Sequence, residues 1–276
     1  MPIPKALTIA GSDSGGGAGI QADLKTFAAF GIYGCSVITA ITAQNTLQVT
    51  GVESVSPDMV RKQLEAVLSD IRPDVVKTGM MANAHIIRAV ASSLSAARRI
   101  PLVVDPVMLS KSGDALLDQD AAVTIREQLF PLADLITPNI PEAEVLTGRR
   151  LRTADDFEQA ARQLQSMGTR SVLLKGGHRP RLQDESDSGS DEVVDLFFDG
   201  REFHFVRGPW VDTPHTHGTG CTLASAIAAG LAQGLELHPA ILQARIYLTK
   251  ALESGFVVGE GISPLHHFHH WWTGNR

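Results

Sequence analysis

The sequence predicts an α/β fold in which helices cover both faces of a mostly parallel central sheet. Short apolar runs at residues 5–10, 101–105 and 171–174 are bounded by Gly, Pro or polar residues, which is typical of buried strands. Between such runs the chain carries apolar residues at helical spacing, as in residues 57–71. This alternation of buried strands and amphipathic helices is the pattern of βαβ units.

Composition and charge narrow the class of protein. The 276 residues include 43% hydrophobic residues and carry a formal net charge of -6, without any block of Lys or Arg. A chain of this length can form one large α/β domain or two small ones, and since no interdomain linker is evident we expect a single domain, residues 1–276. The charge argues against nucleic acid or an anionic membrane as the principal partner. Since no apolar stretch approaches the roughly 18 to 20 residues that cross a bilayer, and no signal peptide is evident, we expect no membrane span and a cytoplasmic location. Cys35 and Cys221 are too few for a disulfide framework or a cysteine-based zinc site.

The first half of the chain opens with a strand that leads into a glycine-rich loop at residues 11–19. The spacing of these glycines fits neither the dinucleotide-binding fingerprint nor the P-loop, so nucleotide sites of those types are not expected here. The loop can bring its backbone close to a small ligand, or it can serve as a flexible connector. The expected strands are residues 5–10, 34–43, 52–55, 74–78 and 101–105, and the expected helices are residues 20–30, a helix opened by Pro57, and residues 85–95.

The second half continues the alternation and adds antiparallel strands. Because Asp199-Gly200 is a typical two-residue hairpin turn, residues 193–198 and 202–206 are expected to pair at the edge of the sheet. The other expected elements are strands at 134–138 and 171–174, and helices opened near Asn139, at 155–167, after Gly220 and at 239–255.

Two segments of the second half stand apart in composition. Residues 183–192 are acidic and polar without any apolar residue, so we expect an exposed mobile loop there. The C-terminal tail, residues 265–276, is rich in His and Trp. We expect it to pack against the protein or a partner, because no Cys or carboxylate completes a metal site within it.

Several side chains that can contact a ligand follow expected strands, at the edge where parallel sheets bind their ligands: Gln44, Met80, Asp105, Asn139 and Lys175. Asp105 and Glu142 offer hard oxygen atoms that can hold Mg²⁺ together with substrate phosphates. The alternative is that these two carboxylates only cap a turn and a helix. Lys175 precedes two glycines, and it can either face a phosphate or lie on the surface.

Residues 218–221, which we call the anion cradle, combine a tight turn with the start of a helix. Gly218 and Gly220 flank Thr219, and the helix that follows leaves its first amides unpaired at the positive end of its dipole. Cys221 falls in the first turn, where this field is expected to lower the pKa of its thiol and favour thiolate. The alternative interpretation is an ordinary loop-to-helix turn with a buried cysteine.

Together these motifs resemble the ribokinase superfamily, and within it the bacterial hydroxymethylpyrimidine/phosphomethylpyrimidine kinases of thiamine biosynthesis. The resemblance runs from residue 6 to about residue 264 and is carried by the combination of motifs, since single pieces are not specific. In order, the motifs are residues 10–23 with their glycines, Thr42-Ala-Gln-Asn45, Lys77-Thr-Gly-Met80, Val104-Asp-Pro-Val107, Thr137-Pro-Asn139 with Glu142, Lys175-Gly-Gly-His178, and His217-Gly-Thr-Gly-Cys221.

The resemblance implies a ribokinase-like three-layer α/β/α fold with antiparallel strands at the edges of a mostly parallel sheet. It also implies a kinase that uses ATP and Mg²⁺ to phosphorylate 4-amino-5-hydroxymethyl-2-methylpyrimidine and then the resulting monophosphate. A homodimer is expected on the same ground.

Residue by residue, the resemblance places the pyrimidine near Gly11, Asp23, Gln44 and Met80. Asp105 and Glu142 match the family's magnesium-associated acids, and Lys175 matches a residue that faces the ATP phosphates. Gly218, Thr219 and Gly220 match the anion hole for the transferred phosphoryl group. Cys221 stands where most sugar kinases of the superfamily have an aspartate base, so it is the candidate catalytic residue.

Three other functions remain open from the sequence. A pyridoxal kinase on the same fold would also phosphorylate a hydroxymethyl group on a six-membered heteroaromatic ring. A non-catalytic protein that binds a pyrimidine or a vitamin B6 compound would keep the pocket without turnover, although the set of Asp105, Glu142, Lys175 and Cys221 argues against it. A thiol hydrolase built on Cys221 is weaker still, because the glycines of the anion cradle explain more of the stretch.

Overall fold

The computed structural model describes residues 2–108, 119–176 and 192–272. The acidic loop expected at residues 183–192 lies outside these ranges, apart from Glu192. The tail expected at 265–276 is described as far as residue 272.

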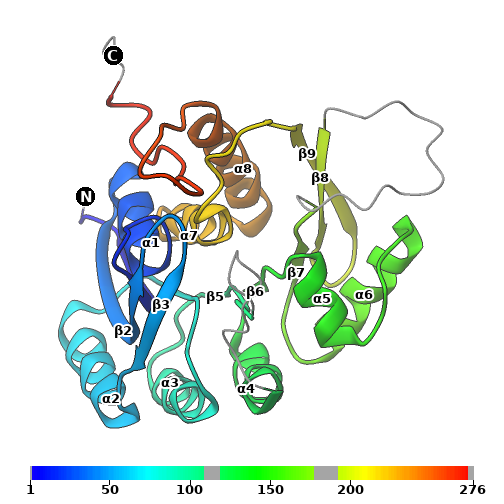
Figure 1. The fold of residues 1–276 in the computed structure, drawn as a ribbon. Helices are drawn as coiled ribbons and strands as arrows, with labels where there is room; N and C mark the ends of the chain where they lie inside the picture. The colour runs from blue at the N-terminus through cyan, green and yellow to red at the C-terminus, as the bar shows by residue number, and fades with distance from the viewer. Residues whose placement is uncertain (1, 109–118, 177–191, 273–276) are drawn as a thin grey trace.

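The described residues form a nine-stranded sheet in the order β3-β2-β1-β4-β5-β6-β7-β8-β9 (Figure 1). The six strands from β2 to β7 pair in parallel, whereas β3 at one edge and β8 and β9 at the other are antiparallel. The strands are β1 (Lys5–Asp13), β2 (Tyr33–Gln44), β3 (Val49–Ser54), β4 (Val75–Thr78), β5 (Leu102–Val104), β6 (Leu135–Ile136), β7 (Val172–Leu174), β8 (Glu192–Phe198) and β9 (Phe203–Pro209).

Helices cover both faces of this sheet. They are α1 (Gly19–Ala29), α2 (Pro57–Ala66), α3 (Ala84–Ala96), α4 (Gln119–Thr124), α5 (Ile140–Thr147), α6 (Ala154–Ser166), α7 (Thr219–Ala232) and α8 (Leu237–Glu253). The three-layer α/β/α architecture with antiparallel edges, expected from the sequence, is confirmed.

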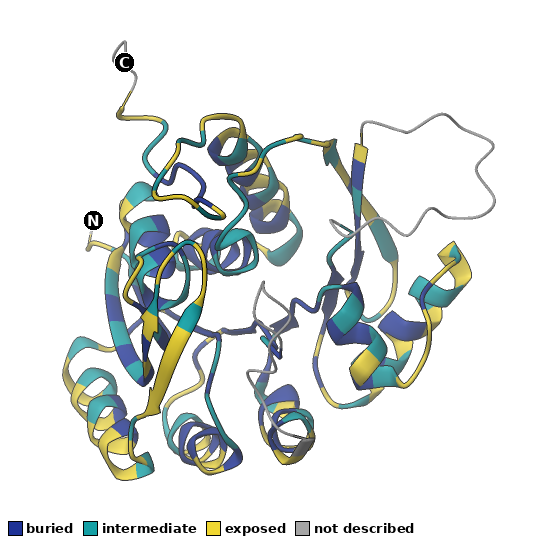
Figure 2. Cartoon of the chain, viewed as in Figure 1, coloured by how far each residue is buried: buried dark blue, intermediate teal, exposed yellow. Residues whose placement is uncertain are grey.

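Alternation along the strands divides the core into two layers. Leu7 and Ile9 of β1 pack with the helices α2 to α6, and Ala6 packs with α1, α7 and α8 on the opposite face. In β4, Val76 likewise packs in the layer of Leu7 and Ile9, and Val75 packs in the layer of Ala6. Figure 2 shows the buried sides of the helices turned toward the sheet, with β3 exposed at the edge. Because successive side chains of a strand point to opposite faces, one apolar run supplies both layers.

The structure differs from the expected elements in two places. β1 continues past Ala10 to Asp13, because it resumes its pairing with β2 after an irregularity at Gly11. A helical segment also occupies residues 119–132, where the sequence analysis placed no element. Its buried Ala121, Ile125 and Leu129 are spaced four residues apart, which is the signal that could have revealed it.

The first residues of the C-terminal tail pack against the protein as expected, whereas Trp271 and Trp272 are exposed. Leu265, His266 and His267 are buried, and the backbone of His217 pairs with Pro264 just before them. The tail therefore lies beside the loop that leads into α7. Within the described residues, no helix is both long and apolar enough to pass through a membrane.

Candidate active site

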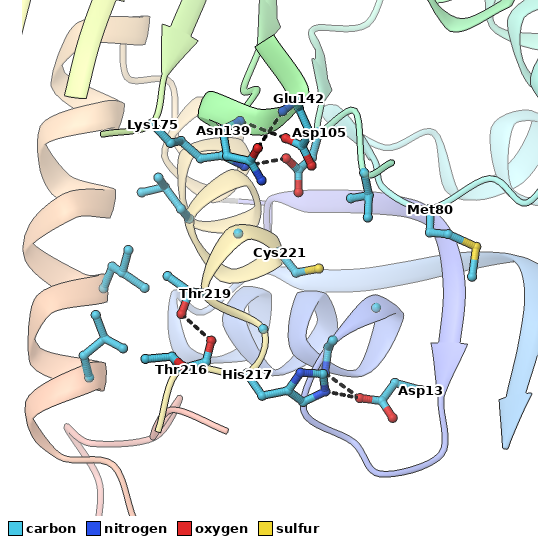
Figure 3. A pocket seen from close by; sticks show the side chains of 18 of the residues that line it. Asp13, Met80, Asp105, Asn139, Glu142, Lys175, Thr216, His217, Thr219 and Cys221 are labelled. Carbon is cyan, nitrogen blue, oxygen red and sulfur yellow. Dashed lines mark hydrogen bonds and ion pairs between the residues drawn. The ribbon is translucent and has the colours of Figure 1, made fainter. Parts of the chain in front are cut away.

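The carboxyl ends of the parallel strands open into a cavity of about 560 Å³ (Figure 3). Ten of the eleven site residues predicted from the sequence line it: Gly11, Gln44, Met80, Asp105, Glu142, Lys175, Gly218, Thr219, Gly220 and Cys221. They come from five strand ends or the loops that follow them and from the starts of α5 and α7. The parallel topology thus brings together residues more than 200 positions apart.

An ion pair occupies one end of this cavity. Lys175 Nζ lies 2.8 Å from Asp105 Oδ1, which also accepts a hydrogen bond of 3.0 Å from Thr137 Oγ1. Burial raises the pKa of Asp105, but Lys175 and Lys77 more than offset this, so its pKa lies below the ordinary value. Burial alone would lower the pKa of Lys175, and its acidic neighbours raise it above the ordinary value. Both groups are therefore charged at neutral pH.

Glu142 sits beside this pair in the first turn of α5. Asn139 caps the helix: its side chain accepts from the Glu142 amide, and Glu142 Oε2 accepts from the Asn139 amide at 2.8 Å. Burial raises the pKa of Glu142 to about 7, against the opposing effect of Lys175 and with a further contribution from Asp105. The capping role left open from the sequence is thus real for Glu142, and it coexists with a place in the cavity wall.

The anion cradle depends on Gly218. Its φ is +84°, and a Cβ at this position would come within 1.9 Å of the Gly17 carbonyl oxygen. Gly220 faces the ion pair, since a Cβ there would meet Lys175 Nζ at 3.4 Å. The start of α7, the positive end of the helix dipole, therefore lies beside Lys175.

A second polar cluster lies at the other side of the cradle. Asp13 Oδ2 contacts His217 Nε2 at 3.0 Å and also accepts from the amides of Gly17 and Ala18. Gln44 Nε2 is placed 3.3 Å from the same His217 nitrogen. This cluster joins the glycine-rich loop to the anion cradle. The sequence analysis quoted Asp13 and His217 within motifs but did not single them out as site residues.

The cavity continues between β8, β9 and α8 as an apolar extension. Val193, Pro209, Leu248 and Leu252 line it. Asp195 also lines this part of the cavity, where its carboxylate accepts a hydrogen bond of 2.7 Å from the Gly176 amide.

These features occur in a recognisable family. The model of the family described as phosphomethylpyrimidine kinase matches residues 13–266. The chain belongs to this family. Its sheet, helices and edge strands are those of the ribokinase-like fold that the sequence resemblance implied.

Individual relatives cover most of the chain. It is 48% identical over 269 residues to the hydroxymethylpyrimidine/phosphomethylpyrimidine kinase of Synechococcus elongatus, spanning 98% of this chain and 99% of that one. It is 52% identical over 268 residues to the thiamine biosynthesis bifunctional protein ThiED of Geobacter sulfurreducens; this alignment covers 96% of this chain but only 53% of that protein. A solved structure, the pyridoxal kinase from Staphylococcus aureus in complex with pyridoxal, is similar with a TM-score of 0.88 at 33% identity, covering 99% of this chain and 96% of that one.

The structure corrects the expectation for Asp23. This residue does not line the cavity, because its carboxylate is fully buried beneath it. Lys77 Nζ lies 2.9 Å from both of its oxygens, and Thr8 and Ser225 each donate a hydrogen bond to it. The motif similarity located Asp23 near the site but could not tell a side chain that touches a ligand from one that supports the floor.

The expected thiolate at Cys221 is also corrected. Burial raises the pKa of its thiol to about 11, and the carboxylates of Asp23 and Asp105 add to this effect. The charge of Lys77 and a hydrogen bond from the Gly19 amide oppose it without prevailing. The helix field was foreseen from the sequence, whereas the two buried carboxylates near the sulfur were not. Cys221 is therefore a neutral thiol at pH 7 in this structure.

Proposed function

We propose that this protein is an ATP- and Mg²⁺-dependent kinase that phosphorylates 4-amino-5-hydroxymethyl-2-methylpyrimidine and then its monophosphate, as a step of thiamine biosynthesis. The observation that carries the proposal is the convergence of the Asp105–Lys175 pair with the anion cradle. A phosphoryl group between them would meet a lysine and the amides of a helix start at once. Phosphoryl transfer depends mainly on such positioning and charge stabilisation.

The two halves of the cavity suit the two substrates. Gln44 can present both a donor and an acceptor to an aminopyrimidine edge, and Met80, whose Sδ and Cε pack over Gly11, offers an adaptable apolar surface. The apolar extension beside Leu248 and Leu252 suits a purine ring. Cys221 lies between Met80 and helix α8 (Figure 3). We therefore propose that the hydroxymethyl group lies at Cys221 and the ATP phosphates at Lys175.

The charges of the site favour a divalent cation with the nucleotide. Among the described residues, Asp105 and Glu142 face the cavity beside one lysine, Lys175, so polyphosphate would meet excess negative charge without a cation. No group of three or more metal-ligating side chains occurs in the described part of the chain. This suits Mg²⁺, which keeps several waters and is commonly bound through one or two carboxylates plus substrate phosphates. Asp105 and Glu142 would hold the ion, and its chemistry would be to neutralise charge on the transferred phosphoryl group.

The role proposed for Cys221 follows from its neutral thiol. A thiol can position the hydroxymethyl oxygen but accepts no proton until it ionises. We propose that Cys221 chiefly positions this group and acts as the base only through its thiolate fraction. Most of the catalysis would then come from the phosphate-binding groups.

A pyridoxal kinase is the second candidate, supported by the similarity to the Staphylococcus aureus enzyme. The higher identity to hydroxymethylpyrimidine/phosphomethylpyrimidine kinases favours the pyrimidine. We further propose that the chain acts as one kinase domain, since all described strands join one sheet, and that it forms a homodimer in the cytoplasm. Light scattering on the purified protein tests the oligomeric state.

A phosphorus NMR time course tests the proposed function. The purified protein is incubated with ATP and Mg²⁺ and either hydroxymethylpyrimidine or pyridoxal, beside Cys221→Ala and the matched control Cys35→Ala, which changes a thiol remote from the cavity. Monophosphate followed by diphosphate from the pyrimidine is expected, largely lost only in Cys221→Ala. Phosphorylation of pyridoxal but not of the pyrimidine would make the protein a pyridoxal kinase, the second candidate. If neither compound is phosphorylated, both candidate functions are refuted.

A further inference from the structure

One imidazole nitrogen, His217 Nε2, faces two polar groups at once. Asp13 Oδ2 lies 3.0 Å from it, and the Gln44 carboxamide lies 3.3 Å from it. All three residues line the cavity, and they come from β1, β2 and the loop before α7. The hydrogen atoms that these groups can share determine what Gln44 presents to a ligand.

Asp13 fixes the protonation of this nitrogen. Burial raises the pKa of Asp13, but hydrogen bonds from His217 and from the amides of Ala18 and Gly15 lower it below the ordinary value. The carboxylate is thus ionised at neutral pH and only accepts hydrogen bonds. His217 Nε2 must then carry a hydrogen and donate it, whichever charge the ring has.

This hydrogen decides the orientation of the Gln44 carboxamide. With the Gln44 amino group facing His217, two donors would meet at 3.3 Å. Thr42, on the other side of the carboxamide, requires the same orientation. Its single hydroxyl hydrogen is donated to the Ser12 carbonyl at 2.9 Å. Thr42 Oγ1, which lies 3.3 Å from the Gln44 carboxamide, can therefore only accept a hydrogen bond from it. When Gln44 Oε1 faces His217 and Nε2 faces Thr42, Nε2 donates to Thr42, and Oε1 shares with Asp13 the one hydrogen on His217 Nε2, as the longer of its two contacts.

We propose that His217, oriented by Asp13, is a positioning residue that fixes the Gln44 carboxamide and thereby selects an aminopyrimidine over pyridoxal. The inference rests on the proposed function for the identity of the ligand. Gln44 keeps one free lone pair on Oε1 and one free hydrogen on Nε2, so its edge presents an acceptor beside a donor.

The chemistry of the two candidate substrates makes this orientation selective. Beside its hydroxymethyl group, the aminopyrimidine carries an amino donor and then a ring-nitrogen acceptor. At the corresponding positions pyridoxal carries a formyl acceptor and then a hydroxyl group. Turning the ring over about the axis through the hydroxymethyl-bearing carbon keeps that group at Cys221, but in both compounds it brings a C–H and then a ring nitrogen to Gln44, so it does not restore the match. A reversed Gln44 carboxamide would therefore favour pyridoxal, and one that rotates freely would lose the discrimination.

The test compares kcat/KM for the two substrates in wild type, His217→Ala, Asp13→Asn and the double variant. His238→Ala, at a residue outside the cavity, serves as the control. We expect the pyrimidine-to-pyridoxal ratio to fall tenfold or more in each single variant, mainly through the KM of the pyrimidine, with kcat changed less than threefold. The double variant should lose no more than either single one, because both changes release the same carboxamide. A ratio within twofold of wild type in folded His217→Ala would overturn the proposal.

A second measurement separates this inference from the proposed function. Nitrogen-15 NMR of the wild-type imidazoles, without substrate, should show hydrogen bound to His217 Nε2, and Asp13→Asn should allow the tautomer protonated on Nδ1. A wild-type ring protonated only on Nδ1 would overturn the assignment. If wild type phosphorylates neither compound, the proposed function fails while this spectrum still decides the orientation of His217. Asp13→Asn, a nearly isosteric change, keeps the test open if His217→Ala does not fold.

Discussion

Lys77 and Asp23 form an ion pair that is completely enclosed beneath the candidate active site. Lys77 Nζ lies 2.9 Å from both Asp23 oxygens, and neither side chain has any exposed surface. Thr8 and Ser225 each donate a further hydrogen bond to the Asp23 carboxylate, so β1, β4, α1 and α7 are joined at one point. The pKa of Lys77 stays above its ordinary value, because the nearby carboxylates, first that of Asp23 and then that of Asp105, help to outweigh the opposing effect of burial.

Removing one partner of this pair should destabilise the protein strongly. Asp23→Asn leaves a buried ammonium without its counter-charge, for which a loss of about 3–5 kcal/mol in the free energy of unfolding is typical. Urea denaturation measures it. The control is Glu192→Gln, which breaks the exposed pair with Arg207 and should cost less than about 1 kcal/mol. Equal effects of the two variants would contradict the structural role given to Asp23.

The fold could be predicted from the sequence because its signals are local. Apolar runs such as residues 101–105 and the Asp199-Gly200 turn fix strands and hairpin without knowledge of their partners. That the strand-end side chains would meet at one edge followed from the rule that ligands bind at the carboxyl ends of parallel strands, whereas the order of the strands was not predicted. The helix at residues 119–124 was missed although its apolar spacing was readable.

The chemistry of the site could be predicted only in part. Residue type and position after a strand sufficed to place Asp105, Glu142 and Lys175 at the cavity, although the sequence could not exclude that the two acids only cap a turn and a helix. The raised pKa of Cys221 could not be predicted, since it depends first on burial of the thiol and then on the carboxylates of Asp23 and Asp105, which lie far away in the sequence. The contact between Asp13 and His217 likewise joins residues separated by 204 positions.

Alkylation tests the neutral thiol of Cys221. In a Cys35→Ser background Cys221 is the only cysteine, so iodoacetamide reports on it alone. We expect slow modification at pH 7 and an increase in rate toward the pKa of about 11. Denatured protein provides the reference for an unperturbed thiol. A midpoint below that of the denatured chain would mean that the helix field prevails after all.

Replacing Glu142 should stabilise the protein at neutral and alkaline pH. Its pKa rises from 4.5 to about 7 on folding, so the native state favours the protonated form. Stability contributed by that form is present below pH 4.5 and lost as pH rises through 7. Glu142→Gln keeps an oxygen for the Asn139 amide and removes this loss, so its advantage should be small at pH 4.5 and reach at most about 3 kcal/mol above pH 7.

Thermal or urea unfolding across this pH range measures the effect. Glu158→Gln, on α6 and away from the cavity, is the control and should show no comparable trend. If Glu142 holds Mg²⁺ as proposed, the kinase activity of Glu142→Gln should fall although its stability rises. A variant that is less stable than wild type at pH 8 would contradict the raised pKa.

Lys175→Met should abolish most of the kinase activity without unfolding the protein. The variant loses the cation proposed to contact the ATP phosphates, and removal of one such electrostatic group typically costs about 100- to 1,000-fold in kcat. Lys62→Met, an exposed lysine of α2, is the matched control. Steady-state kinetics at saturating pyrimidine with varied ATP measure kcat and KM separately. Activity within threefold of wild type would place the phosphates elsewhere in the cavity.

His267 links the C-terminal tail to the helix that carries Cys221. Its Nε2 lies 3.0 Å from Thr222 Oγ1, and Tyr247 donates a hydrogen bond to its carbonyl oxygen. Burial lowers the pKa of His267 to about 3, and the charge of Lys25 adds to this effect. The folded protein therefore favours the neutral imidazole at this position.

His267→Gln should make the protein less sensitive to acid. A depressed folded-state pKa contributes stability that is present above the unfolded value of 6.5 and lost as pH falls toward 3. Between pH 7 and pH 5 wild type should lose about 2 kcal/mol through this residue, since each pH unit below 6.5 costs roughly 1.4 kcal/mol. His267→Gln should lose correspondingly less, as measured by urea unfolding at both pH values. The exposed His85→Gln provides the comparison, and an equal acid sensitivity in His267→Gln and wild type would show that the tail does not bury a neutral imidazole against α7.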